Sequence, residues 1–94
     1  MKDVKDLSKF LRQSRENAGL TQMDVASRLN YSSAQFISNW ERGLSSPPMK
    51  TLNVLAQMYK VGTDDLFKAI LAISLHATET SLRRQYKAVV RKRG

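Results

Sequence analysis

Apolar residues recur at helical spacing in short blocks along this chain, and each of the first three blocks ends at a glycine or an asparagine. The first block covers residues 4–18 and ends before Gly19, the second covers residues 21–29 and ends at Asn30, and the third ends at Gly43. Gly and Asn tolerate the positive φ that ends a helix. Since no alternating β-branched run lies between turn signals, the sequence predicts an all-α fold.

Two further helices are expected after these blocks. Apolar residues at helical spacing predict one of them over residues 49–59. The other begins near Leu66, after a cap at Thr63 or Asp64. Its C-terminal part has two alternatives: it continues to Arg91, or it breaks near residues 76–78, where a threonine could cap a separate helix.

Composition limits the classes of function. Sixteen Lys and Arg against eight acids give a net charge of +8, which favours a polyanionic partner. With no cysteine and one histidine, no disulfide, cysteine-ligated zinc or histidine-rich metal site can form. No secretory signal or stretch of about 18 apolar residues is present, so we expect a cytoplasmic protein without membrane contact or cofactor.

The second and third blocks form the arrangement that carries function. Both are short helices with one apolar face, and a tight turn at Asn30 separates them. The third is capped by Ser32 or Ser33 and turns Phe36, Ile37 and Trp40 inward. Asn and Gln amides match adenine N7 and N6, and the alanine methyl can touch thymine. We therefore expect this helix to read the DNA major groove with its outward side chains, which are Ala34, Gln35, Ser38, Asn39 and Arg42.

The segments LTQMDVASRLN, FISNWERG and PPMKTLNVLAQMYKVGTDDLF resemble the helix-turn-helix domain of phage repressors and Cro/C1-type (XRE family) bacterial regulators, over residues 6–67. The resemblance implies a five-helix repressor-like domain in residues 1–68 and a C-terminal helical extension in residues 69–94. It further implies a sequence-specific regulator of transcription, a repressor in preference to an activator. Such a protein would bind double-stranded DNA as a homodimer and associate with the nucleoid.

Position by position, the resemblance assigns roles to named residues. It implies an ion pair between Arg15 and Glu41. Two departures from the family pattern are Asn30 in place of a glycine and one extra residue in Tyr31–Ser33. With the longer turn, Tyr31 either lies over the DNA backbone or packs beside Phe36. The implied base contacts are Ala34, Gln35, Ser38 and Asn39, and the implied backbone contacts are Gln22, Ser33, Arg42, Ser46 and Lys50.

The C-terminal extension leaves two questions open. Its apolar stripe either covers its own domain or forms a dimerisation surface, and we favour dimerisation. Residues 78–94 hold six basic residues and one acid, which either contact phosphates or another acidic partner, or complement the helix dipole. The alternative function is a protein-interaction or antitoxin-like adaptor that uses this helix. No enzyme or small-molecule effector site is indicated. The stripe is Leu71, Leu75, Leu82, Tyr86 and Val89.

Overall fold

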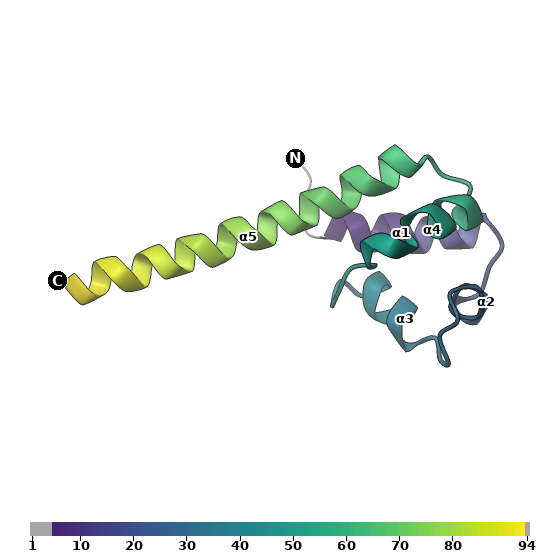
Figure 1. The fold of residues 1–94 in the computed structure, drawn as a ribbon, viewed down its shortest axis with the longest axis horizontal. Helices are drawn as coiled ribbons and strands as arrows, with labels where there is room; N and C mark the ends of the chain where they lie inside the picture. The colour runs from purple at the N-terminus through teal and green to yellow at the C-terminus, as the bar shows by residue number, and fades with distance from the viewer. Residues whose placement is uncertain (1–4, 94) are drawn as a thin grey trace.

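The computed structural model describes residues 5–93 and contains five α-helices in that range, with no strand (Figure 1). This confirms the all-α, five-helix prediction. The expected start of the first helix at Val4 lies outside the described residues. The helices are α1 (Lys5–Asn17), α2 (Gln22–Arg28), α3 (Gln35–Glu41), α4 (Leu52–Tyr59) and α5 (Thr63–Arg93), with a 3₁₀ turn, η1 (Met49–Thr51), before α4.

The hydrophobic core lies around α1, which packs against α3, α4 and the start of α5, while α2 packs against α3. Each helix turns its apolar side chains toward this core. Fully burying a Leu, Ile or Val side chain contributes roughly 1.5–3 kcal/mol, so the short helices α2 and α3 depend on this core for their stability. The buried apolar residues are Leu7, Leu11, Val25, Ala26, Ile37, Trp40, Leu55, Ala56, Met58, Tyr59, Leu66 and Ile70.

The turns that separate the first helices follow the sequence signals. Thr21 caps α2 by accepting a hydrogen bond from the Asp24 backbone N–H at 3.0 Å, and the Asp24 carboxylate accepts one from the Thr21 N–H at 2.8 Å. This reciprocal pair is a capping box. Gly19, Asn30 and Gly43 have φ of 74°, 64° and 77°, which confirms the left-handed turn expected at Asn30 and the ends of α1 and α3.

The segment before α4 differs from the expected continuous helix over residues 49–59. Pro48 is extended, and its carbonyl accepts hydrogen bonds from the Thr51 N–H and hydroxyl at 2.9 and 2.7 Å. That geometry closes a 3₁₀ turn, so the α-helix begins only at Leu52. Met49, expected in the apolar stripe, is therefore half-exposed.

The last helix also begins earlier than expected. Lys60 ends α4 with a left-handed φ of 58°, and the Gly62 carbonyl accepts the Leu66 N–H at 3.1 Å. This bond starts the helix at Thr63, so Thr63 and Asp64 lie in its first turn and are not caps. Acidic side chains in a first turn are favoured by the helix dipole.

Helix α5 runs without a break for 31 residues, which decides between the two alternatives for its C-terminal part. Figure 1 shows it projecting from the body formed by the other helices, as the long element that ends in yellow. All described side chains from residue 74 to residue 91 are exposed, so its apolar stripe does not cover its own domain. Within residues 5–93, no helix is long and apolar enough to cross a membrane.

Candidate nucleic-acid interface

Helices α2 and α3 are short and are joined by residues 29–34. Helix α3 lies at the surface of the domain (Figure 1). Ile37 and Trp40 are buried and fix α3 on the core. On the other side of α3, Gln35 and Arg42 are exposed, and Ala34, Ser38 and Asn39 are partly exposed. Every residue predicted to contact bases thus retains at least some exposed surface.

The longer turn after Asn30 determines where α3 begins. Ala34 occupies the N-cap position without a side-chain cap, and the Ser33 hydroxyl accepts a hydrogen bond from the Gln35 N–H at 3.3 Å. The expected cap at Ser32 or Ser33 is therefore displaced by one residue or more. Gln35 is the first helical residue, so Ser33 and Ala34 precede the helix.

Phe36 was expected to face the core but is 54% exposed. At about 100° per residue, Phe36 lies about 40° from Trp40 and 100° from Ile37 around the helix, so it is at the edge of the buried face. Its ring packs on Tyr31 with centroids 4.9 Å apart, and Tyr31 meets Trp40 edge-on at 6.2 Å. Of the two alternatives for Tyr31, packing beside Phe36 is the one observed. Phe36 joins the exposed side of α3, which the sequence did not indicate.

A chain of hydrogen bonds restrains the polar side chains of α3. The Gln35 Nε2 donates to the Asn39 Oδ1 at 2.9 Å, and the Arg42 Nη2 donates to the same oxygen at 3.0 Å. Residues three and four apart are neighbours on a helix surface. The Asn39 amide nitrogen and the Gln35 amide oxygen have no partner within this chain of bonds, so they can serve as donor and acceptor toward a ligand.

A buried polar network joins α3 to α1 and α2. The Arg15 Nε and Nη2 donate to the two carboxylate oxygens of Glu41 at 2.6 and 3.1 Å, and the two side chains are only 11% and 4% exposed. The hydrogen bond to Glu41 raises the pKa of Arg15 against the opposing effect of burial. The ion pair implied by the family resemblance is confirmed.

Two further bonds complete this network. Gln22 donates from Nε2 to Glu41 Oε1 at 3.0 Å, and Arg15 Nη1 donates to the Leu20 carbonyl at 2.7 Å. Gln22 therefore braces α3 from the first position of α2. The buried Tyr59 hydroxyl makes no hydrogen bond among the described residues, and burial raises its pKa above the usual value.

Comparison with known proteins gives the family. A model described as a helix-turn-helix domain matches residues 6–69. The chain belongs to the helix-turn-helix family. It is 40% identical over 60 residues to the HTH-type transcriptional regulator ImmR of Bacillus subtilis (strain 168), covering 64% of this chain and 46% of that protein. It is 31% identical over 86 residues to the HTH-type transcriptional activator BcrR of Enterococcus faecalis, covering 89% and 42%. The chain thus spans less than half the length of these curated relatives.

The other predicted contact residues of this helix-turn-helix domain lie on separate elements. Arg42 follows the last residue of α3, Ser46 lies in the loop after it, and Lys50 lies in η1. All three are exposed. Ser33 is also exposed, whereas Gln22 is partly buried by its bond to Glu41. The structure thus leaves the predicted backbone contacts open to solvent, except for Gln22.

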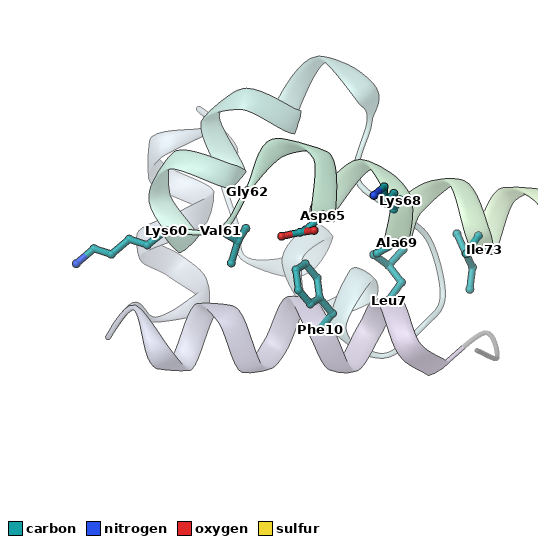
Figure 2. Close-up of a pocket in the computed structure, with 10 residues that line it drawn as sticks. Leu7, Phe10, Lys60, Val61, Gly62, Asp65, Lys68, Ala69 and Ile73 are labelled. Atoms are coloured by element: carbon teal, nitrogen blue, oxygen red, sulfur yellow. The ribbon is translucent and has the colours of Figure 1, made fainter. Parts of the chain in front are cut away.

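One concave surface of the helix-turn-helix domain was not indicated by the sequence. A groove of about 520 Å³ lies between α1 and the start of α5 (Figure 2). Phe10, Val61 and Ala69 give it an apolar lining, and Asp65 places one carboxylate there. No residue of α2 or α3 lines it.

No group of three or more potential metal ligands occurs in the described part of the chain.

Proposed function

We propose that this chain is a sequence-specific, double-stranded DNA-binding regulator of transcription that places α3 in the major groove. One observation carries the proposal: α3 is fixed to the core by Ile37 and Trp40 while its other side holds the hydrogen-bonded row Gln35, Asn39 and Arg42. Helix-turn-helix proteins read base edges with side chains of the second helix. A row already restrained in the free protein loses little side-chain entropy on binding.

In this proposal the side chains of α3 read the bases directly. In the restrained row, the Asn39 amide nitrogen remains a donor, and the Gln35 amide keeps its oxygen as an acceptor and one N–H as a donor. A donor with an acceptor is the pattern that pairs with adenine N7 and N6. The Ser38 hydroxyl can form a hydrogen bond with any of the bases, and the Ala34 methyl can make an apolar contact with a thymine methyl. Phe36 adds a second apolar surface beside Gln35. We therefore expect a half-site that contains A·T pairs.

The remaining contacts position the domain without specifying sequence. These contacts to phosphates come from five places in the domain. They are Gln22 in α2, Ser33 in the turn before α3, Arg42 after the end of α3, Ser46 in the following loop and Lys50 in η1. Contacts of this kind set register, and the cationic ones make affinity fall with salt. We propose that the protein acts in the cytoplasm on nucleoid DNA. We expect repression, since a bound domain can block a promoter by occupancy alone.

We further propose binding as a homodimer to a two-fold operator, because helix-turn-helix dimers match half-sites about one helical turn apart. Selection from random duplexes, followed by sizing of the complex, tests the function. We expect enrichment of a two-fold motif and two chains per duplex. Recovery of no motif after repeated rounds, with equal affinity for every duplex, would contradict sequence-specific binding.

The exposed apolar stripe of α5 supports a second candidate, an antitoxin-like or adaptor protein that binds another protein with this helix. The two functions differ in their response to DNA. If the chain shows no salt-dependent binding to any DNA duplex but binds one protein stoichiometrically, that result would favour the adaptor function.

A further inference from the structure

An aromatic ring borders the polar row of α3. Phe36 is the second residue of this helix, and it is 54% exposed. Around the helix it lies about 40° from the buried Trp40 and about 60° from Asn39 on its other side. Asn39 is the residue to which the other two members of the hydrogen-bonded row donate. The Phe36 ring is therefore placed between the core and this row.

Residues of the turn before α3 hold the Phe36 ring. Its centroid lies 4.9 Å from that of Tyr31, and the Tyr31 ring meets Trp40 edge-on at 6.2 Å. The Tyr31 N–H donates to the Ala26 carbonyl at 2.9 Å, directly after the left-handed residue Asn30. Tyr31 is also packed against the hydrophobic core. An aromatic side chain has only two χ angles, so these contacts restrain the exposed ring before any partner binds.

The core does not account for the exposed part of Phe36. Ile37 and Trp40 are 0% and 2% exposed and fix the inner side of α3. Single exposed apolar side chains are common on protein surfaces, so exposure alone assigns no role. Position is more informative, because helix-turn-helix proteins contact base edges with the first residues of their second helix. Phe36 lies in the first turn of α3.

The chemistry of the Phe36 side chain narrows what it can recognise. A phenyl ring carries no N–H or O–H donor and no lone-pair acceptor, so it selects an apolar group. In the major groove, the apolar group that distinguishes one base from the others is the C5-methyl of thymine, and phenylalanine is among the side chains that contact it. The neighbouring Asn39 amide suits adenine. Both side chains therefore favour A·T pairs.

We propose that Phe36, held by Tyr31, is a specificity-determining residue that contacts the C5-methyl group of a thymine in the bound DNA. The inference rests on the proposed DNA-binding function and adds the chemical group that this side chain recognises. Burial of one methyl-sized apolar group corresponds to a change in affinity of about four-fold. Phe36 therefore contributes to sequence preference, whereas the phosphate contacts of the domain do not.

Substitution of the DNA tests this contact without altering the protein. Each thymine of the duplex selected by the unmodified chain is replaced in turn by deoxyuridine, which lacks the C5-methyl but keeps the O4 acceptor and the base pairing. We expect at least one replacement to lower the affinity about four-fold. A selected duplex in which no thymine is sensitive to this replacement overturns the proposal.

The same scan with Phe36→Ala identifies the side chain responsible. We expect one sensitive thymine to lose its effect, because the variant binds the thymine and deoxyuridine duplexes equally at that position. Any sensitive thymine that remains is then read by another side chain, such as Ala34. Phe67→Ala, which removes a 39% exposed phenylalanine from α5, is the matched control and should keep every sensitive position. Retention of all of them in Phe36→Ala overturns the proposal.

Variants of Tyr31 test the support of the ring. Tyr31→Ala leaves Phe36 in place without its neighbour and should reduce the discrimination between thymine and deoxyuridine, whereas Tyr31→Phe keeps the ring and should retain it. Full discrimination in Tyr31→Ala overturns the supporting role. The scan also separates this inference from the proposed function. A duplex bound with clear sequence preference but insensitive to deoxyuridine excludes methyl recognition alone, whereas recovery of no preferred duplex contradicts both.

Discussion

Glu41 accepts two hydrogen bonds from Arg15 and a third from Gln22, so one carboxylate at the end of α3 connects the three N-terminal helices. Its side chain is 4% exposed. A buried carboxylate is retained where its partners satisfy it. The orientation of α3 therefore depends on this residue as well as on the apolar core.

Glu41→Ala should destabilise the fold strongly, because it leaves the Arg15 guanidinium buried without its partner. Breaking a buried pair in this way costs about 3–5 kcal/mol. Urea denaturation measures the change. The Arg15→Ala/Glu41→Ala double variant should be less destabilised than the two single changes together predict. Strict additivity would show that the two residues do not act as a pair.

Asp24 should make stability depend on acid pH. The Thr21 backbone N–H, and secondarily its side chain, hold the pKa of Asp24 below the usual 3.8. A carboxylate with a lowered folded pKa stabilises the fold above its unfolded pKa, and this contribution is lost as the pH falls through the folded value. We expect Asp24→Asn to be less stable than the unmodified chain at pH 7, and the difference to shrink as the pH falls below the ordinary pKa of 3.8 and through the lower folded pKa of Asp24. A stability difference that is constant with pH would contradict the capping role.

Phe36 and Ile37 are adjacent but should respond differently to truncation. Ile37→Ala removes a fully buried side chain and should cost about 2–5 kcal/mol. Phe36→Ala loses mainly its contact with Tyr31, and an aromatic pair contributes about 0.5–1.5 kcal/mol. Thermal unfolding compares the two. A loss for Phe36→Ala as large as that for Ile37→Ala would mean that Phe36 belongs to the core.

The bond between Gln35 and Asn39 should couple their effects on DNA affinity. Each amide positions the other at 2.9 Å, so removing one disturbs the second. In a double-mutant cycle on the selected duplex, we expect an interaction energy of about 0.5–3 kcal/mol between Gln35→Ala and Asn39→Ala. Independent effects would show that the bond breaks when DNA binds.

Local signals predicted much of the fold. Helical spacing indicated the buried stripes of α1, α2 and α4, and Asn30 and Gly43 marked turns because few other residues accept positive φ. The family resemblance implied the Arg15–Glu41 pair, which spacing alone does not reveal because 26 residues separate the partners.

Where local signals allow two structures, the sequence either misassigned a residue or left both alternatives open. Phe36 and Ile37 are both apolar, and spacing alone does not say which one the core takes. Thr78 can cap a helix, but in α5 it continues one, since nothing there breaks the helix. In the site, the residue types on the exposed side of α3 could be predicted. The hydrogen bonds of Gln35 and Arg42 to Asn39, which restrain these side chains, could not, because helical spacing does not predict side-chain bonds.

Base reading by α3 is tested most directly by measuring the affinity of Asn39→Ala for the selected duplex and for random duplex over a range of salt. We predict a loss of about 1–3 kcal/mol on the selected duplex and little on random DNA. Lys50→Ala should weaken both duplexes alike and reduce the salt slope by about 1. The matched controls Gln13→Ala and Lys9→Ala, both exposed on α1, should change neither affinity. Equal losses on the two duplexes for Asn39→Ala would contradict base reading by α3.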